Sequence, residues 1–467
     1  MKQKSVNPAR RWIFWIAAAV ILVAAIAVGA KLLHHGHDLP AVIEAKAVAL
    51  AEYPEMAPYP NEEEFFAADG TFDDEGFSET YTAWREGKMA QTEQPEGYDD
   101  GYGDFCTASL AQFLDSDGEN RVYSPLNVYL ALGMLAELTD GESRQQILDL
   151  LACDSIDTLR QRSSGLWNAN YCTDGAVTSI LGSSVWLDEG VDFVQETMDQ
   201  LAETYYADAY TGEMGSDEFN EALRCWLNDQ TGGLLKEQAD SIRLSPETIL
   251  ALATTIEYRA KWSNEFNESN TAPGTFHSAD GDVTCDFLHK SGTNTYYWAD
   301  QFAAISRSLR ESGRMWFLLP DEGVDVEALL EDPQALDLLL HGGEDWENQK
   351  FLIVNEAIPK FDVVSQLDLI AGLKALGITD VFDGAVSDFS PMTETMNGIF
   401  VSQVRHDARV AIDEEGVTAV AYTVMAEAGA SMPPEEEVDF TVDRPFLFGI
   451  TSRTGQLLFV GLVQTPG

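Results

Sequence analysis

The pattern of apolar and polar positions divides the chain into three parts with different expected structures. Residues 12–30 form a run of nineteen residues without a charge. Residues 31–104 are dominated by acidic residues interspersed with proline and glycine. From residue 105 onward, apolar residues are frequent along the whole segment. We therefore predict an export element over 1–30, a spacer over 31–104 and a globular body over 105–467.

The apolar run has the charge pattern of a secretory element. It follows the basic residues Lys2, Lys4, Arg10 and Arg11, which predicts insertion with the N-terminus inside. The run is long for a cleavable signal peptide and just long enough to span a bilayer, while Val28 and Ala30 offer a small-residue cleavage site. A signal peptide and a signal anchor both remain open. In either case the chain is expected to be secreted or extracellular, with membrane contact only through residues 12–30 if they are not removed.

The acidic segment is predicted to be an extended, self-repelling spacer. Between residues 40 and 104 we count 17 acidic side chains against Lys46, Arg85 and Lys88. Such a composition cannot bury much apolar surface. Its aromatic residues, among them Phe65 and Trp84, leave room for partial docking on the body.

The most informative pattern is the run at residues 417–426, which contains no charge, glycine or proline. Its β-branched and small residues are typical of a strand. Residues 433–437 follow with two prolines and three glutamates, so this end should be exposed, open to a protease and unable to continue a central ladder. An ordinary core strand followed by a loop is the alternative. One alternating face is small or apolar throughout and suits burial beneath a sheet: Val417, Ala419, Ala421, Thr423 and Met425.

Composition narrows the function classes. Apolar residues make up 45% of the 467 residues, which excludes wholesale disorder. The formal charge of −50 argues against nucleic acid or another polyanion as a partner. An odd number of cysteines without CxxC spacing argues against a disulfide scaffold or a zinc ribbon, so we expect mostly buried thiols at Cys106, Cys153, Cys172, Cys225 and Cys285.

No motif nominates an active site. The chain contains no GxSxG, HExxH or GxxxxGK[ST] pattern and no GxGxxG that opens a helix. The body holds four histidines, and His406 lies in a strand-like segment where a lone histidine is usually a hydrogen-bonding core residue. His34, His35 and His37 have no cysteine or carboxylate at ligand spacing, so we interpret them as a polar cluster. We predict no enzyme, no metal and no cofactor.

Several motifs in a fixed order nevertheless resemble one family, the serpin superfamily. The segment Glu414-Glu415-Gly416, the alanine-rich stretch after it and the later Pro433-Pro434-Glu435 are similar to that family's hinge and reactive loop. Each motif is weak alone, but together they extend over about residues 105–467. The others are residues 120–141, Trp226 with Thr231 and Gly233, Lys261-Trp262 with Phe266, residues 318–323, residues 358–361 with 373–382, residues 443–448 and residues 459–461.

The resemblance implies a single α+β domain of three β-sheets and eight or nine helices with an exposed reactive loop. Inhibitory serpins are metastable: a serine protease cleaves the loop and forms an acyl-enzyme, and the freed loop inserts as a new central strand. By the same resemblance the bond to be cleaved is Ala430–Ser431, flanked by Glu427, Ala428, Gly429, Met432 and Pro433. A small side chain at Ala430 implies an elastase-like or subtilisin-like protease as the covalent partner of a monomeric inhibitor.

The resemblance also assigns a hinge and a sheet-opening region, with departures in both. Typical inhibitory hinges carry threonine where this chain has Val417, and a small residue where it has Tyr422. The family's sheet-opening region is matched by Ser124 and His406, whereas Thr254 replaces an asparagine, as Arg224 does elsewhere. These departures favour the alternative of a non-inhibitory serpin that serves as a carrier, a decoy substrate or a surface-structural protein. The hinge comprises Glu414, Glu415, Gly416, Val417, Thr418, Ala419, Val420 and Ala421.

Overall fold

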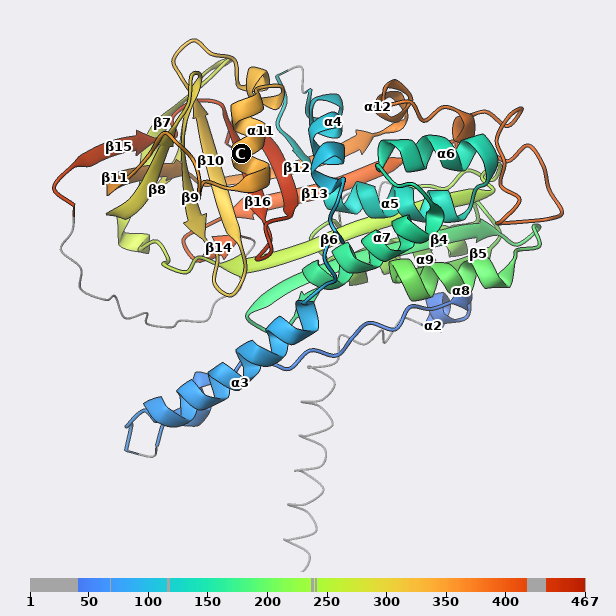
Figure 1. Cartoon of the computed structure of the whole chain (residues 1–467), viewed down its shortest axis with the longest axis horizontal. Helices are drawn as coiled ribbons and strands as arrows, with labels where there is room; N and C mark the ends of the chain where they lie inside the picture. The colour runs from blue at the N-terminus through green and yellow to red at the C-terminus, as the bar shows by residue number, and fades with distance from the viewer. Residues whose placement is uncertain are drawn as a thin grey trace, which may run out of the picture. The chain divides into compact units, whose positions relative to one another are not determined.

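The structure is a computed structural model that describes residues 41–67, 69–115, 118–236, 239, 242–417 and 434–466 (Figure 1). Its contacts divide the chain into residues 1–41 and residues 42–467, and the description below concerns the second unit. Among the described residues, no helix combines the length and the apolar character needed to cross a bilayer. The apolar run at residues 12–30 lies outside them.

The first network of strands forms the long sheet that contains the hinge. All neighbours in it pair antiparallel except β4 and β5, which are parallel. The order across the sheet is β1 (Ala47–Ala49), β5 (Ala207–Gly212), β4 (Val177–Asp188), β6 (Leu250–Lys261), β14 (Gly416–Val417), β13 (Arg405–Ile412) and β12 (Phe361–Asp368), and β3 (Cys172–Thr173) pairs with β4.

The second network joins the strands expected to form two smaller sheets. The long strand β8 pairs with β7, β11 and β9 in turn, so the network is continuous. The α+β serpin-like fold predicted from the sequence is confirmed. The order is β15 (Glu437–Thr441), β11 (Gln349–Pro359), β8 (Gly281–Trp298), β9 (Phe302–Ser308), β10 (Arg314–Pro320), β16 (Phe446–Thr451), β17 (Leu457–Val463) and β2 (Arg121–Tyr123), and β7 (Thr271–Ser278) pairs with β8.

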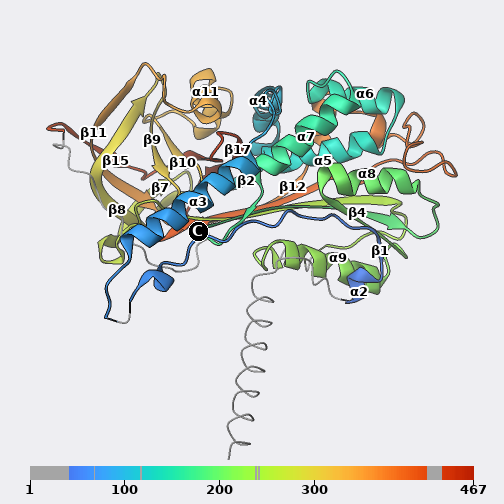
Figure 2. The ribbon, with the colours of Figure 1, turned by 60° about the horizontal axis from the view of Figure 1, so that its bottom comes forward.

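Helices cover both faces of the first sheet. Figure 2 shows α5, α7 and α8 on one face and α9 on the other. Helix α5 begins where Ser124 accepts a hydrogen bond from the amide of Asn127, with Pro125 in the first turn. The α-helices are α2 (Ala41–Glu44), α3 (Asp74–Thr92), α4 (Tyr102–Leu114), α5 (Pro125–Glu137), α6 (Gly141–Leu150), α7 (Ile156–Asn170), α8 (Gln195–Tyr205), α9 (Asp217–Gln230), α11 (Pro333–His341) and α12 (Ile370–Ala375).

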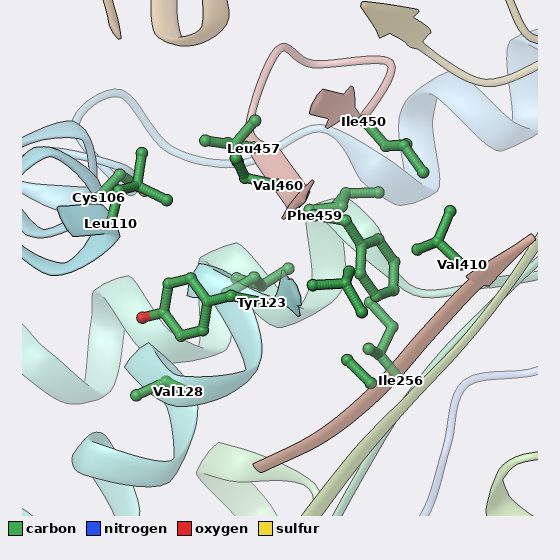
Figure 3. Packing of buried hydrophobic residues seen from close by; sticks show 14 of the residues in the cluster. Cys106, Leu110, Tyr123, Val128, Ile256, Val410, Ile450, Leu457, Phe459 and Val460 are labelled. Carbon is green, nitrogen blue, oxygen red and sulfur yellow. The ribbon is translucent and has the colours of Figure 1, made fainter. Parts of the chain in front are cut away.

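The core lies between the two strand networks and helices α4 and α5. Tyr123 of β2 and Val128 of α5 pack there with Phe459 of β17, and Ile256 and Val410 of the first sheet lie beside them (Figure 3). All these side chains are buried. Because β6 and β13 contribute to this core, any strand that enters between them must present small or apolar side chains to it. The short 3₁₀ helices are η1 (Glu62–Phe65), η2 (Glu268–Asn270), η3 (Val326–Leu330) and η4 (Asp380–Phe382).

The described part of the predicted spacer is not extended throughout, because residues 42–60 and 81–101 fold against the body. Strand β1 adds to the edge of the first sheet by pairing with β5. The amide of Ala51 donates to the buried carboxylate of Asp208 at 3.0 Å. The ring of Tyr53 lies 5.2 Å from that of Trp167. This stretch therefore follows the partial docking that its aromatic residues left open, rather than an extended course.

Helix α3 docks through its C-terminal half. Trp84 is buried, its indole nitrogen donates to the carbonyl of Ala57, and its ring lies 4.9 Å from that of Tyr59. Lys88 forms a buried ion pair with Asp174 at 2.6 Å. The net charge of the segment misled the prediction because these few aromatic and cationic side chains all lie on the face that meets the body.

Candidate functional site

The hinge begins inside the first sheet. Gly416 pairs with Lys261 of β6, and Val417 pairs both with Ala260 of β6 and with Ile412 of β13. Val417 is 1% exposed. Strand β14 therefore already separates β6 from β13 at this end of the sheet, and the inward orientation predicted for Val417 agrees with its burial.

Gly416 is required by a close approach of two backbones. A Cβ atom at this position would lie 2.3 Å from the carbonyl oxygen of Ala260 and 2.7 Å from the Cα of Lys261. No side chain fits in that space without moving β6 away from the hinge.

A tight turn connects β13 to β14. The carboxylate of Asp413 accepts hydrogen bonds from the amides of Glu415 and Gly416 at 2.9 and 3.0 Å. Trp262 holds the same turn from outside, because its indole nitrogen donates to the carbonyl of Asp413 and its amide donates to that of Glu415, both at 2.9 Å. The hinge backbone is thus fixed by one acidic residue from within and one tryptophan from outside.

The carboxylate of Glu414 ties the turn to the second network. It accepts from the ammonium of Lys360 at 2.8 Å and from the hydroxyl of Thr271 at 2.7 Å. Partial burial alone would raise the pKa of Glu414, but these two hydrogen bonds keep the pKa below its ordinary value. Glu414 is therefore ionised at neutral pH, and the pair it forms with Lys360 anchors the hinge.

A buried ion pair supports the aromatic side of the hinge. Arg307 binds Glu356 at 2.6 Å, and both side chains are less than one tenth exposed. The guanidinium of Arg307 lies 4.1 Å from the ring centre of Phe266 and 5.5 Å from that of Trp262. Burial, with repulsion from Arg307, lowers the pKa of Lys290 nearby to about 8. Arg307 thus packs against the aromatic rings of Trp262 and Phe266, and Trp262 in turn contacts the hinge.

His406, assigned to the sheet-opening region, is the second residue of β13. Its Nε2 accepts from the amide of Ser124 at 3.0 Å, so the proton of the neutral ring is on Nδ1. Burial lowers the pKa of His406 to about 4. Neither its Nδ1 nor the side-chain amide of Asn127 has a hydrogen-bond partner among the described residues. Two buried polar groups therefore remain unsatisfied at this point of the sheet.

A small cavity lies under the sheet beside His406. Its volume is about 30 Å³. Its lining comes in part from β6 and from the β13 segment, the two strands between which β14 lies. The lining includes Leu132 and Leu135 of α5, Leu252 and Thr254 of β6, and Val404 and His406 of the β13 segment.

The buried imidazole predicts a loss of stability in acid. The pKa of His406 is about 4 in the folded protein against an ordinary 6.5, so the unfolded chain takes up this proton first as the pH falls. The contribution of the neutral ring is complete above about pH 6.5 and is lost between there and pH 4, which amounts to about 3 kcal/mol. We expect the thermal unfolding midpoint to fall over this range and His406→Asn to flatten part of that fall. Exposed His289→Asn is the control, and equal profiles for His406→Asn and the parent would contradict the assignment.

The other end of the predicted reactive loop is anchored in a different sheet. Strand β15 pairs parallel with β11, with Glu437 opposite Ile353. Beyond it, Arg444 donates to the carbonyl of Pro320 at 2.8 and 3.0 Å. The described residues on the two sides of 418–433 thus lie in different sheets, Val417 in the first and Glu437 in the second network.

The predicted site residues fall into two groups. Glu414, Glu415, Gly416 and Val417 lie together at the hinge, and Ser124, Thr254 and His406 lie about halfway along the sheet. Of the last three, only Ser124 and His406 are hydrogen-bonded to each other. The remaining predicted residues lie outside the described part of the chain: Thr418, Ala419, Val420, Ala421, Glu427, Ala428, Gly429, Ala430, Ser431, Met432 and Pro433.

Some residues of the site were not found from the sequence. Lys360 and Trp262 lay within noted motifs, but nothing in their spacing indicated that both contact the hinge. The orphan amide of Asn127 was missed entirely, although it occupies the same turn of α5 as the cap made by Ser124. Arg224, noted as a departure, forms an ion pair with Glu221 on α9 and does not reach the hinge.

Comparisons with known proteins agree with this arrangement. A family model described as serpin (serine protease inhibitor) matches residues 100–466. The human leukocyte elastase inhibitor is 26% identical over 368 residues, which cover 76% of this chain and 96% of that protein. The crystal structure of a thermophilic serpin, Tengpin, in the native state matches with a TM-score of 0.70 at 22% identity, over 80% of this chain and 95% of that one. A structure of thyroxine-binding globulin in complex with thyroxine matches with a TM-score of 0.65 at 20% identity, over 77% and 98% of the two chains.

Proposed function

Because the chain belongs to the serpin family, we propose that it is a serine protease inhibitor that traps its target by inserting its cleaved loop between β6 and β13. The family alone does not decide this, since a structural neighbour binds thyroxine. The observation that carries the proposal is β14, in which the first hinge residues already occupy a place between those strands.

The register of β14 matches the predicted loop to the length of β6. Val417 pairs with Ala260, so each further residue of an inserted antiparallel strand would pair with one residue earlier in β6. Continuing this register brings Glu427, the first charged residue after the hinge, opposite Leu250 at the beginning of β6. The charge-free run at 417–426 therefore covers residues 251–260, which are ten of the twelve residues of β6.

The same register brings the loop to the unsatisfied part of the sheet. Thr423 would lie between Thr254 and His406, and Met425 would lie opposite Leu252, beside the small cavity. A hydroxyl and an apolar side chain suit those surroundings. Burying the inward face would contribute about 5–10 kcal/mol. The new ladder would add ten or more hydrogen bonds of about 1 kcal/mol each. The insertion is thus strongly favourable.

Trapping requires that insertion outrun hydrolysis. The serine oxygen of the protease attacks the carbonyl carbon of Ala430, and the bond to the nitrogen of Ser431 breaks. The amine takes up the proton and leaves as a new chain end, while an ester joins Ala430 to the protease. Water normally cleaves that ester. A small residue at Ala430 suits elastase-like or subtilisin-like enzymes, and the human relative is a leukocyte elastase inhibitor.

A non-inhibitory serpin is the second candidate, favoured by the sheet-opening region. Thr254, the unpartnered Nδ1 of His406 and the unpartnered amide of Asn127 leave that network incomplete among the described residues, unlike the network of Ser, Asn and His in the family. In that case the loop would be cut as a plain substrate. A rise in melting temperature after loop cleavage distinguishes the two functions, since only an inserted strand adds the stabilising contacts.

We also propose that the protein acts outside the cytoplasm, as a monomer and without cofactor or polyanion activator. The proposal of export rests on the basic and apolar N-terminal residues 2–30. Activation by a polyanion would need a basic helix face, and 28 lysines and arginines against 78 acidic residues are too sparse to build one.

The reactive bond can be tested with the full-length chain, since residues 42–60 and 81–101 pack on the body. Mixing it with an elastase-type protease should give a band at the summed mass on a denaturing gel. Ala430→Pro should abolish the band, because proline at this position is not accepted for acyl transfer, and Ala430→Arg should exchange elastase reactivity for trypsin reactivity. The conservative Ala430→Val should retain the band. Cleavage that leaves the protease fully active would exclude the inhibitor.

A further inference from the structure

The N-terminal segment carries a small folded unit that the serpin fold does not need. Residues 61–67 and 69–77, here called the aromatic knob, comprise η1, a turn and the beginning of α3. Phe66 and Phe72 form an isolated β-bridge, and the amide of Asp73 donates to the carbonyl of Phe65 at 2.8 Å. The side chains of Asn61 and Asp73 cap the two helical starts. The knob is therefore an ordered local structure.

Four phenylalanine rings form the centre of the knob without being buried. Phe72 packs against Phe65, Phe66 and Phe77, with ring centres 6.5, 4.9 and 5.6 Å apart. None of the four is among the buried residues, and Phe66 is 54% exposed. Clustered aromatic rings that face solvent on a folded protein mark a binding surface more often than isolated exposed residues do.

The surroundings of these rings are acidic. Residues 61–79 contain eight aspartates and glutamates and no lysine or arginine. Glu63, Glu64 and Glu75 are exposed, and their carboxylates make no ion pair in the described part of the chain. An aromatic centre with an acidic rim is complementary to an apolar patch on a basic protein surface.

The position of the knob relates it to the reactive loop. Helix α3 is fixed by Lys88 in its C-terminal half and, just before its midpoint, by the hydrogen bond of 2.6 Å from Tyr81 to Glu311. The residues of α3 before Tyr81 extend beyond these anchors. In Figures 1 and 2 alike, that end of α3 lies on the same side of the molecule as β7, β8, β11 and β15, and in Figure 1 it projects away from the body. Strand β15 is the second anchor of the predicted reactive loop.

We propose that the aromatic knob is a docking surface for the target protease, and that it selects proteases with a basic face beside the catalytic cleft. This inference rests on the proposed inhibitory function. The carboxylates would accelerate encounter by electrostatic steering, and Phe66 would anchor the complex as an aromatic contact. Nucleic acids and anionic membranes do not fit, because both would be repelled by the same carboxylates, as would a second copy of a chain with a charge of −50.

The test compares two elastase-type proteases of the same primary specificity, one with a basic and one with an acidic surface. The full-length chain is compared with Glu63→Gln/Glu64→Gln/Glu75→Gln and with Phe66→Ser. For the basic protease we expect the charge variant to lower the association rate about tenfold at low salt and little at high salt. We expect Phe66→Ser to lower the association rate with the basic protease about fivefold at both low and high salt. Neither variant should affect the acidic protease.

A matched control removes the same charge elsewhere. Glu142, Glu196 and Glu203 are exposed on α6 and α8, which lie at the opposite end of the body in both views. Their combined change to glutamine should leave the rate near that of the parent. Knob variants that react as fast as this control would overturn the proposal, and so would equal losses with both proteases.

The experiment distinguishes failure of the docking proposal from failure of the proposed inhibitory function. If the parent forms no covalent complex with either enzyme, the inhibitory function fails. Equilibrium binding to the basic protease with its catalytic serine changed to alanine then tests the knob by itself. Weaker binding of both knob variants than of the control supports the docking surface, and equal binding excludes it.

Discussion

Replacing Ala421 by glutamate is expected to turn the proposed inhibitor into a plain substrate. The register of β14 brings Ala421 opposite Ile256 of β6 and Ala408 of β13 after insertion, and both of those residues are buried. A carboxylate placed there without a partner loses its hydration, which costs several kcal/mol. Insertion would then be slower than hydrolysis of the acyl-enzyme. The covalent band should disappear, and more than ten inhibitor molecules should be consumed per protease molecule inactivated.

The matched control changes a residue three positions earlier and on the other face. Thr418 would lie opposite Arg259 and Ala411, which are half-buried and face away from the core. Thr418→Glu places a carboxylate beside a guanidinium, so inhibition should be retained. Cleavage of Thr418→Glu should still raise the melting temperature, whereas cleavage of Ala421→Glu should not. If both variants inhibit equally well, the loop does not insert in this register.

The different outcomes expected for Ala421→Glu and Thr418→Glu follow from the alternation of side chains between the two faces of a strand. The sequence already shows this alternation. The charge-free run from Val417 and its small alternating face identify an insertable strand because side chains alternate between the two faces. The structure supports the first step of that prediction, since Val417 is buried between the two expected strands. The α+β fold was also predictable, because each family motif is a short run of residues that can be recognised in the sequence without knowing distant contacts.

What the sequence could not predict depends on contacts between distant residues. Glu414 meets Lys360, 54 positions earlier, and Trp262 meets Asp413, 151 positions away. Neither partner is marked by spacing, so the fold alone brings them together. Asn127 is a second example. Its position on α5 can be predicted from the sequence, but the lack of a hydrogen-bond partner for its side-chain amide is visible only in the packed core.

The N-terminal segment shows how net charge can mislead. A stretch with 17 acidic residues predicts an extended chain, yet a few side chains on one face determine its fold. Tyr53 and Trp84 pack into aromatic contacts, and one of only three basic residues, Lys88, reaches a buried partner. Average composition describes what a segment does in isolation, whereas docking depends on where its few apolar and cationic residues lie.

Lys88→Met is therefore expected to release helix α3 from the body. The side chain of Asp174 is 1% exposed and would lose its ion-pair partner. Breaking such a pair costs about 3–5 kcal/mol. The lower end applies here because the amides of Ala176 and Val177 still donate to Asp174 at 2.9 Å. About 3 kcal/mol corresponds to about a hundredfold faster hydrogen exchange, which we expect for residues 74–92.

Two further variants separate the ion pair from the loss of a lysine. Lys46 pairs with Glu218 at 3.3 Å, but that glutamate side chain is 65% exposed, and a surface pair of this kind contributes about 1 kcal/mol or less. Lys46→Met should therefore leave exchange in α3 unchanged. Adding Asp174→Asn to Lys88→Met should restore part of the protection, because the asparagine carbonyl still accepts from both amides and no buried charge remains. Exchange in Lys88→Met as slow as in Lys46→Met would mean that the aromatic contacts of Trp84 alone hold the helix.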